Sequence, residues 1–144
     1  MIQEEELLRE AEKAGFDHYK ILSARKVQFD HSLRKYCEVN YCGNYGKNYS
    51  CPPACGTPEE MEEKAGRFKN VLVLRTITPV QDITDEQETR VIKHRHNQMT
   101  WGLIESLSGK LQDFLPAMAG PCQLCEKCEK GEEKPCRFPN RVAS

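Results

Sequence analysis

The sequence contains no long apolar run and almost no net charge, and each absence excludes a class of protein. No stretch approaches the roughly 20 apolar residues that a membrane helix needs, so we expect no membrane partner. The formal net charge is -1, which gives no general reason to expect a nucleic-acid partner. The chain also lacks a glycine-rich phosphate loop, a Ser/His/Asp catalytic set and the Cys-x3-Cys-x2-Cys motif of radical-SAM enzymes.

The first residues, Met1 to Glu6, are acidic and lack the features of a secretory signal or an Arg-rich transit peptide. We therefore expect a cytoplasmic protein, in a reducing compartment where disulfides are rare. The eight cysteines are then metal or cluster ligands rather than disulfide partners. A chain of 144 residues fits one cysteine-rich, metal-binding domain, residues 1–144, with a single core.

Cysteine is missing from most of the chain and concentrated in two short groups. One group lies between Cys37 and Cys55, and the other lies between Cys122 and Cys136. Thiols that serve as small apolar fillers would be scattered, so two tight groups indicate two ligand sets. The candidate cofactor-binding and metal-ligating residues are Cys37, Cys42, Cys51, Cys55, Cys122, Cys125, Cys128 and Cys136.

The second group has the spacing Cys-x2-Cys-x2-Cys-x7-Cys, and Pro139 follows three residues after its last cysteine. Three thiolates at this spacing turn inward from one tight loop, and a fourth from farther along completes the set, as in bacterial ferredoxins. The match is partial, because the fourth cysteine and the proline both come later here. Structural zinc usually takes two separated cysteine pairs. The spacing therefore favours a cubane iron–sulfur cluster over zinc and over thiols without metal.

The first group has looser spacing, Cys-x4-Cys-x8-Cys-x3-Cys, which fits zinc or a cluster about equally well. Pro52 directly follows Cys51, as a proline follows a ligand in ferredoxins. Cys55 is the weakest ligand candidate, and ferredoxin clusters also exchange fourth ligands along the chain, so an exchange between the two groups stays open. Four tyrosines of this loop either shield a cluster from water or anchor the loop as half-buried side chains: Tyr36, Tyr41, Tyr45 and Tyr49.

Basic and histidine side chains give weaker signals. His94 and His96 lie two apart on a predicted helix, so they point to different sides and are expected on the surface. His31 is a reserve ligand, although a lone histidine is more often structural. Basic residues either offset cluster charge or belong to ordinary solvated loops, the latter being slightly favoured: Arg34, Lys35, Lys47, Lys127, Lys130, Lys134 and Arg137.

Local patterns predict an α+β fold, a single small domain whose short β-sheet packs on helices and carries two cysteine-rich loops. The predicted helices are one that stops at Gly15, a short one from Asp30 to Tyr36, one that begins at a Thr57–Glu60 capping box, and a long one that runs from a Thr84–Gln87 capping box to Phe114. The predicted strands are Tyr19 to Ala24, Lys26 to Phe29, and Val71 to Leu74 with a continuation to Thr78. The Val71 strand is apolar on both faces, which predicts a central position.

Three stretches, in this order, resemble a prokaryotic family of predicted metal-binding proteins, domain-of-unknown-function family 2284. They are residues 34–53, residues 56–61 and residues 122–139. The resemblance covers nearly the whole chain. It implies that the cysteines bind metal, as iron–sulfur clusters, and many family members come from anaerobes.

Our leading hypothesis is an iron–sulfur protein with two [4Fe-4S] clusters that passes single electrons to or from a redox partner protein. It depends on two sets of four cysteines in a chain without another catalytic group. A zinc-stabilised interaction module is one alternative. A redox enzyme in which one cluster keeps an open iron site is another.

Overall fold

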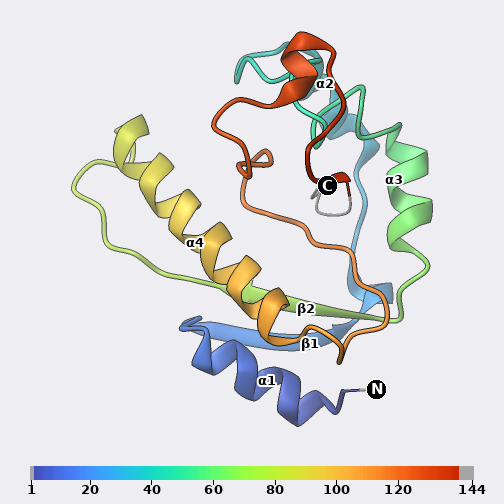
Figure 1. Cartoon of the computed structure of the whole chain (residues 1–144), viewed down its shortest axis with the longest axis vertical. Coiled ribbons are helices and arrows are strands. Elements are labelled where there is room, and N and C mark those ends of the chain that lie inside the picture. Colours follow the sequence, from blue (N-terminus) through green and yellow to red (C-terminus); the bar gives the residue numbers. More distant parts are fainter. Residues whose placement is uncertain (1, 140–144) are drawn as a thin grey trace. The chain divides into compact units, whose positions relative to one another are not determined.

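Four α-helices and one two-stranded antiparallel sheet make up the regular structure of residues 2–139, the part of the chain that the computed structural model describes (Figure 1). This confirms the predicted α+β class. The elements are α1 (Glu4–Lys13), β1 (His18–Ser23), α2 (Arg34–Glu38), α3 (Pro58–Ala65), β2 (Asn70–Arg75) and α4 (Glu86–Ser106), with short 3-10 helices at Ala24–Lys26, His31–Leu33 and Glu129–Glu132.

The chain divides into two compact units. The sheet unit comprises the described residues up to Lys26 together with Lys69–Phe114, and therefore holds α1, both strands and α4. The cysteine unit comprises Val27–Phe68 together with the described residues from Leu115 onward. All eight cysteines belong to the cysteine unit.

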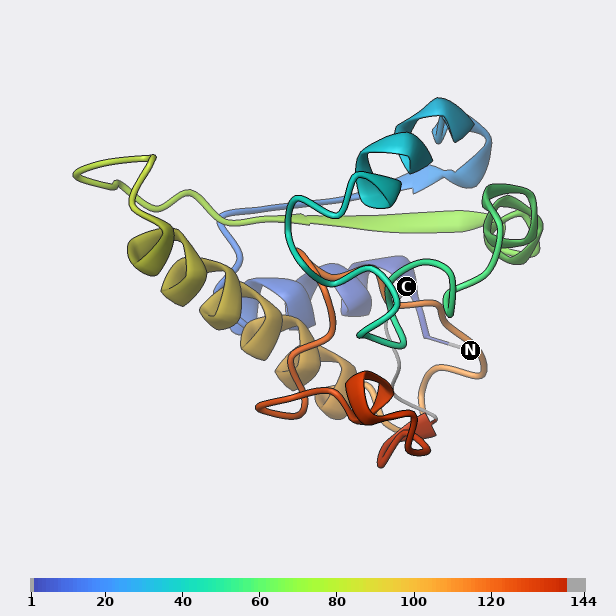
Figure 2. The ribbon, with the colours of Figure 1, turned by 90° about the horizontal axis from the view of Figure 1, so that it is seen from above.

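The core of the sheet unit lies between its two helices and one face of the sheet. β1 pairs with β2 in a register that runs from His18 opposite Arg75 to Ser23 opposite Asn70. Figure 2 shows α1 and α4 on the same side of these strands. The buried apolar side chains of this unit are Ala11, Phe16, Leu103 and Leu107. Leu72 and Leu74 of β2 are among the partly buried side chains that pack against them.

Three helix boundaries agree with the sequence predictions. α1 is followed by Gly15 at a φ of +96°, a left-handed conformation that favours glycine. Asp30 accepts a hydrogen bond from the Ser32 backbone N–H and caps the short helix that leads into α2. Thr57 and Glu60 form the predicted capping box at the start of α3.

The long helix α4 departs from its prediction at both ends. Asp85, not Thr84, is its N-cap, and the Asp85 carboxylate accepts hydrogen bonds from two backbone N–H groups. The Thr84 hydroxyl instead donates to Asp82, which removes it from the cap. The helix ends at Ser106 rather than at Phe114, and Gly109 then adopts a positive φ of +79°. The helix therefore ends before this glycine and does not continue past it.

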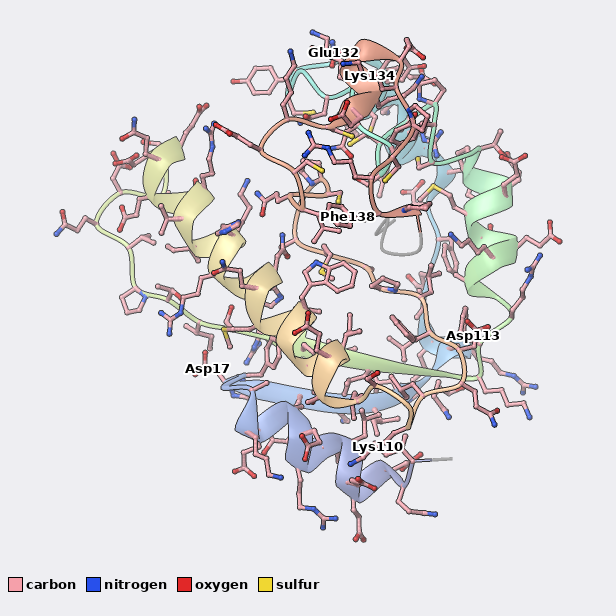
Figure 3. The ribbon with its side chains drawn as sticks, viewed as in Figure 1. Asp17, Lys110, Asp113, Glu132, Lys134 and Phe138 are labelled. Atoms are coloured by element: carbon pink, nitrogen blue, oxygen red, sulfur yellow. The ribbon has the colours of Figure 1, made fainter. Side chains whose placement is uncertain are left out.

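Three strand predictions are wrong. Residues 26–29 form no strand, because the chain turns through the 3-10 helix Ala24–Lys26. β2 is not central, because it pairs with β1 alone, and Val73 on the face opposite Leu72 and Leu74 is 45% exposed. β2 also ends at Arg75. Beyond Arg75, the Ile77 backbone N–H donates a hydrogen bond of 2.7 Å to the carboxylate of Asp17. Asp17 is labelled in Figure 3.

The cysteine unit has no buried apolar core among its described residues. Only Asn48 and Pro52 are buried there, and the buried Phe and Leu side chains all belong to the sheet unit. Hydrogen-bonded turns and short helices supply the order of this unit. No helix in the described part of the chain is long and apolar enough to cross a membrane.

Candidate metal centre

The first cysteine set, Cys37, Cys42, Cys51 and Cys55, lies on α2 and the loop that follows it. Cys37 occupies α2, and the chain then folds through consecutive turns that place the other three thiols. Asn40, Gly43 and Gly46 adopt positive φ angles of 61°, 78° and 71°, which reverse the chain between the cysteines. The Asn40 side chain supports this path by accepting a hydrogen bond from the Tyr45 backbone N–H at 3.0 Å.

The thiols of the first set influence one another. Burial raises the pKa of Cys51, and the charges of Cys42, Cys55 and Cys37 raise it further, against the lowering effect of the Ser50 hydroxyl. A hydrogen bond from the Asn44 backbone N–H lowers the pKa of Cys42. Charges act appreciably only over short distances. The four thiols of the first set therefore lie within range of one another's charge.

Cys55 has a charged neighbour that its sequence context did not indicate. The Arg34 guanidinium lies 4.0 Å from the Cys55 Sγ and 3.2 Å from the Met61 Sδ. Burial raises the pKa of Cys55, while the positive charge of Arg34 opposes that rise. Arg34 was predicted only as one of several basic residues near the first group. The structure places it against the thiol that is the weakest ligand candidate.

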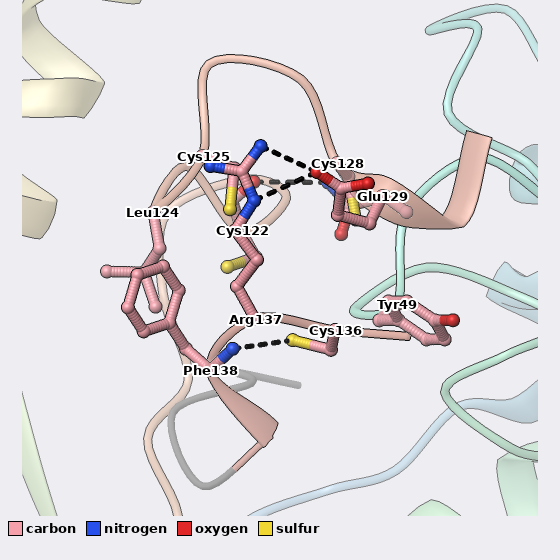
Figure 4. A pocket seen from close by; sticks show the side chains of 10 residues that line it. Tyr49, Cys122, Leu124, Cys125, Cys128, Glu129, Cys136, Arg137 and Phe138 are labelled. Atoms are coloured by element: carbon pink, nitrogen blue, oxygen red, sulfur yellow. Dashed lines mark hydrogen bonds and ion pairs between the residues drawn. The ribbon is translucent and has the colours of Figure 1, made fainter. Parts of the chain in front are cut away.

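The second cysteine set, Cys122, Cys125, Cys128 and Cys136, lines a single pocket (Figure 4). The first three thiols come from one loop, and Cys136 comes from the segment after the 3-10 helix Glu129–Glu132. The Cys136 Sγ accepts a hydrogen bond from the Phe138 backbone N–H at 3.3 Å. The predicted arrangement, three local thiols and one from farther along, is therefore present. No thiol of the first set lines this pocket.

Residues 48–50 connect the two cysteine segments. The Asn48 side chain donates to the Cys122 carbonyl at 3.1 Å, and the Cys122 backbone N–H donates to the Ser50 Oγ at 2.8 Å. Between them, Tyr49 donates its hydroxyl hydrogen to the Lys134 carbonyl at 2.6 Å. In Figure 1 the closing segment, in red, accordingly lies beside the first cysteine loop. These contacts were not predicted, because Asn and Ser in an irregular loop carry no local signal for a distant partner.

Only one of the four tyrosines lies against a described cysteine pocket. Tyr49 lines the pocket of the second set, although it belongs to the loop of the first. Tyr36 and Tyr41 are 64% and 94% exposed, and Tyr45 is also exposed. The prediction that these side chains shield the first set is therefore wrong for Tyr36 and Tyr41, and so is the reading of them as half-buried anchors.

The basic residues near the second set are largely paired with carboxylates. Lys130 pairs with Glu133 at 2.7 Å, and Arg137 donates to Glu129 at 2.6 Å. Lys134 and Glu132, both labelled in Figure 3, lie 2.9 Å apart. These pairs support the reading of an ordinary charged loop over that of a set of free cations around the thiols.

His31 and His96 contact residues other than cysteine. The His31 ring contacts Glu62 at 2.5 Å and Glu59 at 3.5 Å. Both carboxylates belong to α3, so His31 connects the 3-10 helix His31–Leu33 to α3. His94 is exposed as predicted. His96 is only partly exposed, because it bonds Thr76 at 2.8 Å and packs edge-on against Phe16.

The donor chemistry fits soft metal ions and iron–sulfur clusters, which thiolates bind. Each set offers four sulfur donors, and the second set surrounds one pocket. Among residues 2–139, no three His, Cys, Asp or Glu side chains lie close enough together to hold a metal ion, so the sulfurs of each set are farther apart than the ligands of one metal. Side-chain rotation in these exposed loops would have to close each set on a metal.

Comparison with known proteins gives one family match and no individual relative. Residues 20–144 match the family described as "Predicted metal-binding protein (DUF2284)", which agrees with the resemblance seen in the sequence. No curated protein and no solved structure matches the chain.

Proposed function

The chain belongs to this family of predicted metal-binding proteins, and from that premise we propose that it is an iron–sulfur protein with two [4Fe-4S] clusters that transfers single electrons to or from a redox partner protein. The observation that carries the proposal is the sorting of the thiols. Four of them follow one another on α2 and the first loop, within range of one another's charge, and the four others line a pocket that no thiol of the first set lines.

We assign one metal centre to each set. Cys37, Cys42, Cys51 and Cys55 would hold the first, and Cys122, Cys125, Cys128 and Cys136 would hold the second. The pocket of the second set contains all four of its own cysteines and none of the others. This favours ligation within each group over the exchange of fourth ligands that the sequence left open.

The residues around the thiols would tune and protect the centres. A bound iron–sulfur cluster supplies one-electron redox chemistry, and its potential responds to hydrogen bonds, charge and solvent exposure. The Asn44 N–H favours the thiolate of Cys42, and Arg34 does the same for Cys55. At the second set, the Phe138 N–H donates to Cys136, and Tyr49 and Leu124 contribute apolar surface. The proximity of the two loops suits electron passage between the centres.

Anaerobic purification followed by iron and sulfide analysis tests the proposal. We expect a brown protein with about eight iron atoms per chain, as two four-iron clusters require, and paramagnetic resonance signals after reduction. Cys125→Ser and Cys51→Ser should each remove about half of the iron, from different centres. Ser32 is exposed and its hydroxyl donates to Asp30, away from the cysteines, so the control variant Ser32→Ala should retain all of the iron. A colourless protein with stoichiometric zinc and no sulfide would refute the iron–sulfur proposal.

A zinc-stabilised interaction module is the second candidate, and one observation favours it. Pro52 is the one buried apolar side chain among the described residues of the cysteine unit, so a purely structural metal would also explain the order of this unit. The apolar side chains of Leu33, Tyr36 and Val39 are exposed on and beside α2 and would then form the contact surface. A visible absorption spectrum separates the two candidates, because zinc thiolates are colourless.

A further inference from the structure

We propose that Asn48 and Ser50 are positioning residues that couple the two metal centres, so that metal binding at one cysteine set strengthens metal binding at the other. This inference rests on the proposal that both sets bind metal, but it does not depend on which metal they hold. It assigns a role to two uncharged side chains that neither the cysteine spacing nor the family match identifies.

The first step is the burial of Asn48. It is 5% exposed in a unit whose side chains are otherwise mostly exposed or half-buried. Its Oδ1 accepts from the Ser50 backbone N–H at 3.0 Å and from the Ser50 hydroxyl at 2.8 Å, and its Nδ2 donates across to the second segment. A buried amide that is held by three hydrogen bonds is costly to rearrange. Asn48 therefore fixes residues 48–50 as a rigid group.

The second step is the grip on Cys122. Both backbone polar groups of this cysteine are held by that rigid group, the carbonyl by Asn48 and the N–H by Ser50. Cys122 opens the second set, and Tyr49 holds the Lys134 carbonyl two residues before Cys136, which closes it. Residues 48–50 thus hold the second set near both of its ends. Hydrogen bonds of this kind orient metal ligands, and removing one typically costs about 10- to 100-fold in metal affinity.

The third step connects the same group to the first set. Ser50 directly precedes Cys51, and the Ser50 Oγ lies 3.9 Å from the Cys51 Sγ. The Cys51 backbone N–H donates to the Asn48 carbonyl at 3.0 Å. A metal that fixes Cys51 therefore restricts the turn that carries Asn48 and Ser50. Because coupling between binding sites is reciprocal, the factor by which the first set strengthens the second equals the reverse factor.

Anaerobic titration with Co2+, which gives thiolate absorption bands, tests the inference on the full chain under reducing conditions. Ser50→Ala should weaken Co2+ binding at the second set about 10-fold or more, and Ser50→Thr, which keeps the hydroxyl, should restore it. Asn48→Asp keeps the acceptor for Ser50 but puts a carboxylate oxygen against the Cys122 carbonyl in place of the donor, so it should weaken binding as well. Ser32→Ala is the matched control and should bind as the unmodified protein does.

A double-mutant cycle then isolates the coupling. Disabling the first set with Cys37→Ser and Cys42→Ser should weaken the second set in the otherwise unmodified protein, but not further in the Ser50→Ala background. Far-ultraviolet circular dichroism should show the same helix content in every variant. Independent effects of the two changes, or an unchanged second set in both Ser50→Ala and Asn48→Asp, would overturn the inference. Full coupling in a protein that is isolated with zinc would support the inference and refute the iron–sulfur proposal. Failure of either set to bind Co2+ would overturn the coupling inference, whereas the iron and sulfide analysis decides the iron–sulfur proposal on its own.

Discussion

Removal of metal should unfold the cysteine unit while the sheet unit stays folded. The hydrophobic core cluster of the described residues, Ala11, Phe16, Leu103 and Leu107, belongs entirely to the sheet unit. The cysteine unit orders long irregular segments without such a core, and ordering each residue costs about 1–2 kcal/mol of backbone entropy. Hydrogen bonds and, if the proposed function holds, metal ligation would therefore supply its order.

The magnitudes support this difference between the units. Burial of a Phe or Leu side chain contributes about 1.5–3 kcal/mol, so Phe16, Leu103 and Leu107 together contribute roughly 5–9 kcal/mol to the sheet unit. The described residues of the cysteine unit have no such contribution. Structural metal sites in small domains supply about 10–16 kcal/mol of apparent binding free energy. Loss of the metal would therefore remove the largest stabilising contribution from one unit and leave the core of the other intact.

Limited trypsin digestion with mass spectrometry measures the effect before and after anaerobic treatment with an oxidant and a chelator. Lys47 and Lys127 in the cysteine unit, and Lys20 and Lys93 in the sheet unit, are all exposed, so differences in cleavage report the order of the backbone. We expect cleavage at the first pair to accelerate at least 10-fold and cleavage at the second pair to change little. Amide hydrogen exchange should likewise stay slow in β1, β2 and α4.

Restoring the metal should restore protection, which serves as the control for damage by the oxidant. Equal digestion of the cysteine unit with and without metal would refute the argument, because its order would then need no ligand. Simultaneous loss of protection in both units would also refute it, because the core of the sheet unit would then depend on the metal.

Three further predictions concern the core, a helix cap and thiol ionisation. Leu103→Ala should lower the free energy of unfolding by about 2–5 kcal/mol, because it leaves a cavity at a side chain that is 3% exposed, and a change below about 1 kcal/mol in denaturant unfolding would contradict this. Asp85→Ala should cost about 1 kcal/mol through loss of the α4 cap, whereas Thr84→Ala should cost less, and thermal unfolding distinguishes the two. In metal-free protein the pH midpoint for alkylation should be lower for Cys42 than for Cys51. The lowered pKa of Cys42 preserves its thiolate as the pH falls, and the raised pKa of Cys51 delays its thiolate as the pH rises, so coincident midpoints would oppose this.

The elements that the sequence predicted correctly depend on local chemistry. The Thr57–Glu60 capping box and the Asp30 cap need only a few adjacent residues, and both are present. The errors arose where a distant or competing contact decides the structure. Thr84 looked like a cap, but it bonds Asp82 and leaves the cap to Asp85.

The strand from Val71 to Leu74 shows the limit of hydrophobic pattern. Apolar residues on both faces favour a central strand, yet only one face of β2 meets the core. A pattern of four residues does not predict how many neighbouring strands will pair with them. Tertiary context decided the outcome, as it commonly does for strands.

The candidate site was predictable as two groups of cysteines, because their spacing is a local property. Its internal connections were not predictable. Cys122 is held by Asn48 and Ser50 across more than 70 positions of sequence, and a single sequence contains no signal for such a pairing. Tyr49 likewise belongs to the first loop by sequence and to the pocket of the second set by position.

The pairing of Ser23 with Asn70 brings together the two ends of the segment that connects the strands, so this segment is a closed loop that begins and ends at one end of the sheet. The Ala24 backbone N–H donates to the Lys69 carbonyl at 2.8 Å just beyond that pair, so the two ends of the loop are hydrogen-bonded to each other. The entropy of closing such a loop grows slowly, by only about 0.6 kcal/mol for each doubling of its length. The sheet therefore places little constraint on the length of residues 27–68. The spacing of the four thiols and the contacts of residues 48–50 with the second cysteine segment would limit insertions and deletions there. The two strand ends, in contrast, would accept connecting segments of different lengths.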